Sequence, residues 1–181
     1  MKDIILEEFK KNALFRLDES LRMICIALSK IEEDDLWRLP VENGMSLGNQ
    51  ILHSCGNMTQ YIISSLGIQE DLRKRDLEFV VDKSITLDDL LQKLKTTVED
   101  SKRTIEKTTP EKFKEIRLVQ GFELSGVGVV MHAVEHFSYH TGQIAFWVKQ
   151  LTQEDLGFYD GINLNTKNMS DYKKAYISES K

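Results

Sequence analysis

Apolar residues recur along this chain at steps of three and four, the spacing that places them on one face of an α-helix. Four segments show this spacing, at residues 6–31, 46–67, 86–108 and 127–151. No stretch alternates apolar and polar residues for long enough to predict a large sheet, although "FKEIRLVQGFEL" can hold a short extended piece. The pattern therefore predicts four amphipathic helices.

The ends of two predicted helices carry capping signals. Ser46 is a candidate N-cap for the second helix, and Gly67 is a candidate C-terminal stop. The third helix opens with "TLDD", which is similar to a capping box with Asp in place of Glu. Both prolines, Pro40 and Pro110, fall between the periodic segments, as expected of residues that interrupt helices.

The connections between the helices limit the topology. Residues 67–85 and 109–126 are too many for tight helical hairpins, and either stretch can run back along a helix of about 30 Å. At least one crossover is therefore allowed, so the helices need not simply alternate in direction. We expect an all-α fold, a four-helix bundle in residues 1–160, followed by a polar C-terminal tail in residues 161–181.

Composition places the chain among ordinary globular domains. Its 181 residues are 41% hydrophobic and 29% charged, with a net charge of −5. No block of Lys and Arg could neutralise several phosphates, so we expect no nucleic-acid partner. Charges interrupt the first apolar stretch, "MKDIILEEFKKNALF", so neither a signal peptide nor a membrane span is expected. Cys25 and Cys55 have no metal or redox spacing and fit buried thiols in a reducing cytoplasm.

Three of the four histidines lie on the fourth predicted helix, at His132, His136 and His140. Side chains four residues apart on a helix have Cβ atoms about 5–6 Å apart and can bind one metal ion together. Side chains eight residues apart start about 12 Å apart along the helix axis, so they cannot comfortably share an ion. The helix thus offers either its first or its second pair, and a third histidine ligand would have to be His53.

His53 lies on the polar face of the second helix, where the periodicity predicts either exposure to solvent or a polar cleft. Three neutral imidazoles would leave the fourth position on an ion open, as in catalytic rather than structural zinc sites. The residues alone support a second interpretation equally well. In that interpretation, the histidines of the fourth helix are merely polar residues at the edge of the core.

Four stretches of the chain carry a resemblance to a known family: "HSCGNMTQYI", "DLRKRDLEF", "HAVEHFSYHTGQI" and "KQLTQEDLGFY". In this order they resemble the DinB-like superfamily, and most of all a bacterial branch of it, over residues 1 to about 160. The resemblance implies a four-helix bundle of up-down-down-up topology and a homodimer. It also implies a divalent metal ion, zinc or nickel, held by His53, His136 and His140, with His132 one turn outside that triad.

The resemblance also implies a chemistry. Characterised DinB-like proteins include metal-dependent transferases and isomerases that use low-molecular-weight thiols such as bacillithiol or mycothiol. We therefore expect either such a thiol-dependent transferase or a metal-dependent hydrolase, acting on a small molecule, because an ion with an open position can bind a thiolate or activate water. The alternative is a non-enzymatic bundle that binds a ligand or a partner and keeps a structural or vestigial metal site.

Several polar residues are candidates for roles beside the metal. Asn57 and Gln60 share the face of His53 and either line the cleft or face solvent. His132, Asn57 and Gln143 are the candidate catalytic residues, and Gln143 can also hydrogen-bond a ligand imidazole.

The segment "LRKRDLEF" and two aromatic residues complete the set of candidates. Arg73, Arg75 and Glu78 form either a salt-bridged loop over the cleft or a site for an anionic substrate, and we favour the loop. Tyr139 and Trp147 can wall the pocket, but packing in the core is the expected role of each.

Overall fold

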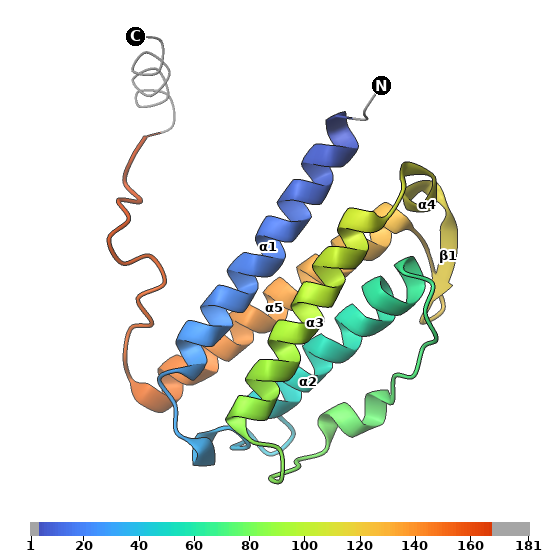
Figure 1. Ribbon diagram of the computed structural model, residues 1–181. Coiled ribbons are helices and arrows are strands. Elements are labelled where there is room, and N and C mark those ends of the chain that lie inside the picture. The colour runs from blue at the N-terminus through green and yellow to red at the C-terminus, as the bar shows by residue number, and fades with distance from the viewer. Residues whose placement is uncertain (1–3, 168–181) are drawn as a thin grey trace.

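Four long helices lie side by side in the computed structural model, which describes residues 4–167 (Figure 1). They are α1 (Ile4–Leu28), α2 (Leu47–Met58), α3 (Leu87–Lys107) and α5 (Gly126–Thr152). Helix α1 packs against α3 and α5, and α2 packs against the same two helices. In Figure 1, α1 and α5 run in one direction, whereas α2 and α3 run in the other. The prediction of a mainly helical fold is confirmed.

The two predicted caps are present. Ser46 accepts a hydrogen bond from the backbone N–H of Asn49, whose side chain accepts one in return from the backbone of Ser46. Thr86 and Asp89 form the same reciprocal capping box at the start of α3. Such a cap contributes about 1 kcal/mol, because it satisfies N–H groups that the first turn of a helix leaves without partners.

Helix α2 does not stop at Met58 but continues as the π-helical segment η2 (Thr59–Leu66). The two parts together end at Gly67, whose backbone N–H bonds to the carbonyl of Ile62. The predicted extent of this helix is therefore correct, whereas the change to the wider π-helical turn was not predicted. Segments of this kind frequently occur at functional sites.

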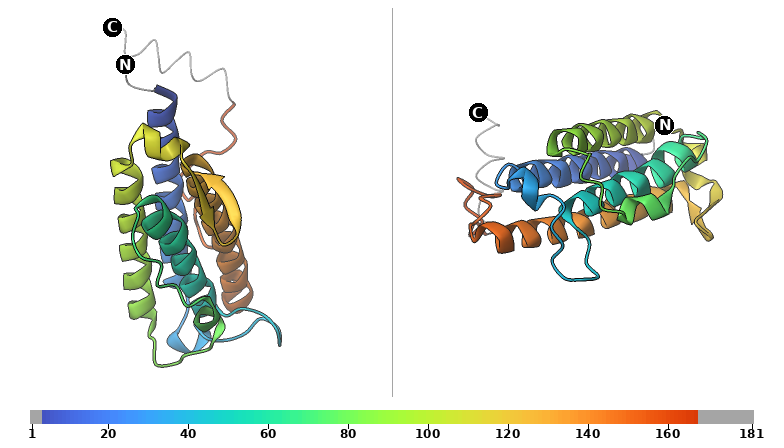
Figure 2. Two further views of the ribbon diagram at one scale, coloured as in Figure 1. Left: turned by 90° about the vertical axis from the view of Figure 1, so that its right-hand side faces the viewer. Right: turned by 90° about the horizontal axis from the view of Figure 1, so that it is seen from below.

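The connection from α2 to α3 returns along the length of the bundle, because both helices run in the same direction (Figure 1). It contains the short helix η3 (Arg75–Phe79), which packs against α2. Seen from below, η3 lies beside α2 on the outside of the four helices (Figure 2). This connection thus covers a face of α2 that none of the long helices covers.

The connection from α3 to α5 forms structure of its own. It holds the short helix α4 (Pro110–Lys114) and a hairpin of β1 (Ile116–Val119) with β2 (Phe122–Ser125). The strands are antiparallel, with Val119 paired to Phe122. The turn uses Gln120 and Gly121 at positive φ, which suits a two-residue hairpin turn. The expected extended piece is present, so the described chain is not purely helical.

The core consists of the apolar stripes that the sequence predicts, because the four helices turn them toward one another. Each Leu or Ile that becomes fully buried contributes about 1.5–3 kcal/mol to stability. The residues that are at most 1% exposed include Leu17, Ile24 and Leu28 of α1, Leu90, Leu94, Val98 and Ile105 of α3, and Val130, Phe137, Ile144 and Val148 of α5.

None of the described helices is both long enough and apolar enough to cross a lipid bilayer. Residues 161–167, the first part of the predicted polar tail, are exposed. The rest of that tail, residues 168–181, lies outside the described residues. The boundary between the domain and the tail therefore stays a prediction.

Candidate metal centre

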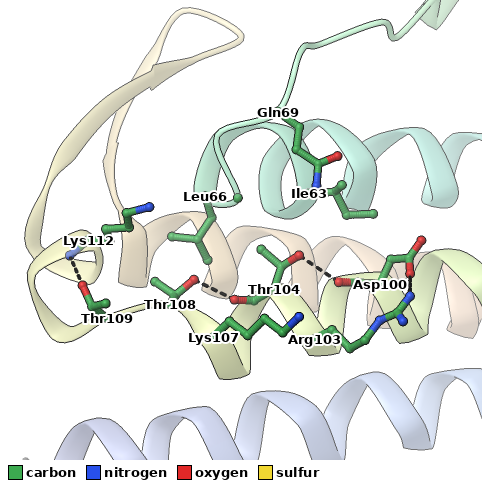
Figure 3. A pocket seen from close by; sticks show the side chains of 11 residues that line it. Ile63, Leu66, Gln69, Asp100, Arg103, Thr104, Lys107, Thr108, Thr109 and Lys112 are labelled. Carbon is green, nitrogen blue, oxygen red and sulfur yellow. Dashed lines mark hydrogen bonds and ion pairs between the residues drawn. The ribbon is translucent and has the colours of Figure 1, made fainter.

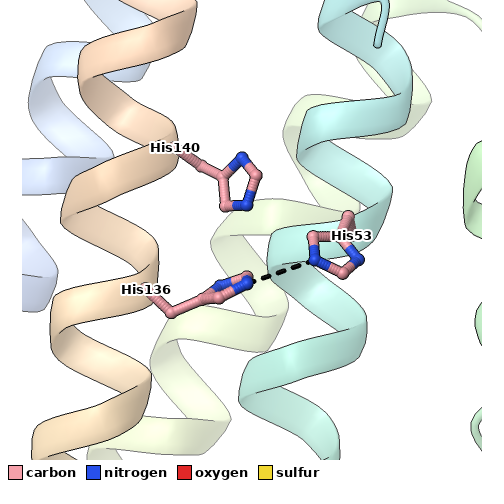
Figure 4. Close-up of side chains that lie close together, drawn as sticks. All are labelled: His53, His136 and His140. Atoms are coloured by element: carbon pink, nitrogen blue, oxygen red, sulfur yellow. Dashed lines mark hydrogen bonds between the residues drawn. The ribbon is translucent and has the colours of Figure 1, made fainter. Parts of the chain in front are cut away.

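Three histidines from two helices converge on one point. His53 comes from α2, and His136 and His140 come from successive turns of α5 (Figure 4). Each offers one ring nitrogen, and the three nitrogen atoms all lie within 4.8 Å of one another. Nε2 of His53 lies 3.1 Å from Nε2 of His136. Of the two pairs that the helix offers, the structure thus brings the second, 136 and 140, together with His53.

The site is largely shielded from solvent. His53 is 8% exposed and His140 is 5% exposed, whereas His136 is only partly buried. Solvent exposure of His53, one of the two possibilities that the periodicity allowed, is therefore wrong. The physical reason is the connection that carries η3, since it packs over the polar face of α2.

Two of these histidines have a hydrogen-bond acceptor beside Nδ1, the ring nitrogen that faces away from the point of convergence. Nδ1 of His53 lies 2.8 Å from a carboxylate oxygen of Glu78, and Nδ1 of His140 lies 3.2 Å from Oε1 of Gln50. Because a carboxylate only accepts, Nδ1 of His53 carries the hydrogen, and the lone pair on its Nε2 faces the centre. Such acceptors behind ligand histidines fix the ring orientation and favour metal binding.

Burial keeps the imidazoles of His136 and His140 neutral, which is the state that binds metals. Burial lowers the pKa of His136 to about 3, helped by the charges that His140 and His53 would carry. Burial likewise lowers the pKa of His140 to about 4. Burial alone would raise the pKa of the Glu78 carboxyl, but hydrogen bonds from Arg73 and His53 outweigh it and hold that pKa below its usual value.

The residues present fit a divalent metal ion. Zinc binds imidazole nitrogens at about 2.0–2.1 Å, so two nitrogens on one tetrahedral ion lie about 3.3 Å apart. The contact between His53 and His136 is already that short, and the three candidate ligand nitrogens all lie within 4.8 Å of one another. Nδ1 of His136 is buried and has no partner among the described residues. The set thus offers three imidazole nitrogens, one fewer than the four ligands of a tetrahedral zinc ion.

His132 lies beside the centre but outside the converging group. Its ring stacks on Tyr61, with centroids 4.1 Å apart, and its Nε2 accepts from the side-chain amide of Asn57 at 3.2 Å. Asn57 is only 3% exposed, so of its two expected positions the solvated helix face is wrong. Its Oδ1 is buried without a partner among the described residues, which leaves one strong acceptor free.

Two candidates on the far side of the centre differ from expectation. No hydrogen bond joins Gln143 to a histidine within the described residues; Gln50 of α2 occupies that role for His140. Tyr139 is 64% exposed, so its expected place in the core is wrong. The ring of Tyr139 contacts His140 edge-on at 5.2 Å, and it lines a shallow pocket together with Trp147 and Gln143.

In the segment around η3, Arg73 and Glu78 form the salt bridge that the sequence suggested, whereas Arg75 forms no ion pair among the described residues. Nε of Arg73 lies 2.7 Å from one oxygen of Glu78, and its NH2 group lies 2.8 Å from the other. The guanidinium of Arg75 lies 4.8 Å from the centre of the Phe79 ring. The sequence placed Glu78 over the cleft but did not predict its contact with His53. The connection has no hydrophobic periodicity, so its sequence does not show which residue of α2 each side chain faces.

The cysteines take no part in the centre. Burial raises the pKa of the Cys55 thiol to about 11 and also raises that of Cys25. A thiol with such a pKa holds its proton at neutral pH and is a poor nucleophile.

A separate pocket lies near the C-terminal end of α3, between that helix and the end of η2 (Figure 3). Its volume is about 420 Å³. The hydroxyls of Thr104 and Thr108 already donate to backbone carbonyls of α3, and Asp100 pairs with Arg103. The polar groups in view are therefore largely satisfied within the protein, and the pocket shows no set of groups for catalysis.

The fold belongs to a known class. It is similar to a DinB-like protein from Bacillus cereus, at 15% identity and a TM-score of 0.63, over 80% of this chain and 91% of that one. A DinB-like protein from Bacillus subtilis matches at 16% identity and a TM-score of 0.60, over 87% and 99% of the two chains. A mycothiol-dependent maleylpyruvate isomerase matches at 15% identity and a TM-score of 0.61, over 80% of this chain and 63% of that chain.

The sequence gives the family directly. Residues 5–160 match the family described as "Protein of unknown function (DUF1572)", a DinB-like family, and the chain belongs to it. No curated protein matches the sequence. The predicted membership of the DinB-like superfamily is therefore confirmed.

Proposed function

We propose that His53, His136 and His140 hold one divalent metal ion, zinc or nickel. The observation that carries this proposal is the convergence of three ring nitrogens within 4.8 Å in a shielded site. The acceptors on two of the outward-facing nitrogens, Glu78 and Gln50, support it, because they turn Nε2 of His53 and of His140 toward the same point.

We further propose that the protein is a metal-dependent transferase using a low-molecular-weight thiol, or a metal-dependent hydrolase. When bound, the ion would supply an open position that lowers the pKa of a thiol or of water. The fold shared with a mycothiol-dependent isomerase supports the thiol, although at 15% identity that likeness concerns the fold alone. The substrate is a small molecule, and the site of action is the cytoplasm.

The chain's own residues have distinct parts in this proposal. Glu78 and Gln50 hold the protons on the outward-facing nitrogens of their histidines. His132 lies one turn from His136 on α5, and Asn57 lies one turn from His53 on α2. These two side chains are placed to contact a substrate or to orient His136. Gln143 lies in the neighbouring shallow pocket, where it can contact only a substrate that extends beyond the centre.

The assembly belongs to the same proposal. The directions of α1, α2, α3 and α5 support a four-helix bundle of up-down-down-up topology. Residues 1–160 form this domain, with residues 161–181 as its tail, and the protein acts as a homodimer. Exposed apolar side chains on α5 support self-association.

Metal analysis is the experiment that tests this function. Protein purified without chelator or affinity metal should contain one zinc or nickel ion per chain. The same protein is then assayed for transfer of thiols to electrophilic substrates, with and without added thiol and after chelation. Activity that needs the metal but no thiol would identify a hydrolase. A protein that neither retains nor binds zinc or nickel would instead support the non-enzymatic bundle.

A further inference from the structure

One stripe along α2 and the adjoining η2 contacts a single segment of the neighbouring connection. The stripe consists of Asn49, His53, Gly56 and Gln60, which are spaced by four, three and four residues and so share one helix face. The segment consists of residues 73–80, which include η3 and which we call the strap. The hydrogen bonds between this stripe and the strap therefore lie on both sides of the metal ligand His53.

The strap is held at both of its ends. The side-chain amide of Asn49 donates to the backbone carbonyls of Glu78 and Val80, each at 3.0 Å. In the adjoining segment η2, Oε1 of Gln60 accepts from Arg73 at 2.8 Å. Between these two contacts, the carboxylate of Glu78 is gripped by Arg73 on one side and by His53 on the other.

Gly56 provides the space for this ion pair. A Cβ atom at this position would overlap the carboxylate of Glu78 and would lie 2.9 Å from Nε of Arg73. The glycine lies within α2, where it costs about 1 kcal/mol relative to alanine. Its backbone shows no positive φ, so helix geometry does not require it. The close approach of the strap requires a glycine at this position.

We propose that the strap is a positioning device for the metal centre, with Arg73 and Glu78 as positioning residues and Gly56 as the notch that admits them. Arg73 fixes the carboxylate of Glu78, and Glu78 holds the hydrogen of His53 on Nδ1. Nε2 of His53 then faces His136 with its lone pair available. The effect on metal affinity rests on the proposed function, whereas the effect on the position of the hydrogen does not.

The size of the effect follows from the chemistry of ligand histidines. Loss of a hydrogen-bond partner behind a ligand typically lowers metal affinity by about 10- to 100-fold. The coupling is reciprocal, so a bound ion should hold the strap on α2 more firmly by the same factor. Amide hydrogen exchange in residues 73–80 should therefore slow when zinc is added.

Gly56→Ala is the variant that tests the strap, with Gly142→Ala as its matched control. Gly142 lies within α5, two residues from His140, and a Cβ there would meet nothing within 4 Å. In metal-free protein, ¹⁵N NMR should place the hydrogen of His53 on Nδ1 in the wild type and in Gly142→Ala, but on a mixture of both nitrogens in Gly56→Ala. Zinc affinity, measured by competition with a chromophoric chelator, should fall about 10- to 100-fold only in Gly56→Ala.

Glu78→Gln provides a second test if Gly56→Ala does not fold. The amide is nearly the same size as the carboxylate but can either donate to Nδ1 or accept from it, so the hydrogen of His53 should no longer be fixed. Unchanged NMR spectra and unchanged zinc affinity in both variants would overturn the proposal, as would an equal loss in Gly142→Ala. If the wild type itself binds no zinc, the proposed function fails, and the NMR result on metal-free protein still decides the role of the strap.

Discussion

Nε2 of His53 lies 3.1 Å from Nε2 of His136, although 83 residues separate the two histidines in the sequence. Two ring nitrogens approach this closely when they share a proton or a metal ion. Burial favours neutral imidazoles here, and neutral imidazoles are metal ligands. The convergence of α2 and α5 at this point therefore leads to the first prediction.

Removal of any one of the three ligands should sharply reduce metal binding. We expect His53→Ala, His136→Ala and His140→Ala each to lower zinc affinity more than about 100-fold, which exceeds the usual effect of a residue behind a ligand. His132→Ala should reduce it less, because His132 contacts Asn57 rather than the converging nitrogens. Metal content by mass spectrometry and chelator competition measure both effects. Equal zinc occupancy in the triple variant and the wild type would contradict this site.

The stability of the metal-free protein should fall in mild acid. The pKa values of His136 and His140 are lowered to about 3 and about 4, whereas an unfolded chain has histidine pKa values of about 6.5. Between these values the unfolded state binds more protons, so the free energy of unfolding decreases as pH falls from about 6.5 toward 4. Each histidine contributes a slope of about 1 kcal/mol per pH unit or less, since His136 keeps some contact with solvent.

Urea unfolding in the presence of chelator, at several pH values between 7.5 and 4.5, measures this slope. A variant with both His136→Gln and His140→Gln removes the two titrating groups and should show a flatter profile. If the variant lost stability with pH as steeply as the wild type does, other groups would be responsible.

The local parts of this molecule could be predicted from its sequence. The stripes at steps of three and four gave the long helices, because burial of one face is a local periodic property. Ser46 and Thr86 gave two helix starts, since a capping box involves only four consecutive residues. The helix period offered two candidate pairs, His132 with His136 or His136 with His140, because residues one turn apart face the same way. The resemblance to the DinB-like superfamily singled out the second pair, which the structure brings together with His53.

The parts that depend on tertiary contacts could not be predicted. Glu78 lies in a connection whose sequence has no period, so nothing in the sequence shows that it faces His53. Gln50 lies on α2, and only the packing of α2 against α5 places it beside His140. The burial of His53 has the same origin, since the strap that covers it is distant in the sequence.

Self-association should involve the exposed face of α5. Met131, Tyr139 and Phe146 are each more than half exposed and are spaced by eight and seven residues, close to two helical turns. A second copy of the chain that covered this stripe would bury apolar area. We expect light scattering to give about twice the chain mass of 20.9 kDa, and Phe146→Glu to shift the protein toward the monomer.

Phe15→Glu is the matched control, because Phe15 is 54% exposed on the separate helix α1. It should leave the mass unchanged. A wild-type mass near 20.9 kDa at every concentration would rule out the dimer.

The hydrogen on His136 should change its position when a metal ion binds. Because Nδ1 of His53 donates to Glu78, Nε2 of His53 is an acceptor, and the metal-free contact at 3.1 Å requires the hydrogen of His136 on Nε2. A metal ion at Nε2 of His136 requires the hydrogen on Nδ1 instead. ¹⁵N NMR of the free and the zinc-loaded protein should show this exchange of tautomers, and a hydrogen already on Nδ1 in the free protein would contradict it.

The relocated hydrogen needs an acceptor, and Asn57 is the residue placed to supply one. Nδ1 of His136 and Oδ1 of Asn57 are both buried and both lack a partner among the described residues. Asn57 binds His132, whose ring lies 5.8 Å from that of His136, and we expect a direct or water-mediated bond from Nδ1 of His136 to Asn57 when the ion binds. Asn57→Leu removes the acceptor and should lower zinc affinity about 10-fold, whereas Asn57→Asp keeps it and should retain affinity. Gln143→Leu, outside the converging group, should bind zinc as the wild type does; the same affinity in Asn57→Leu would show that His136 needs no acceptor.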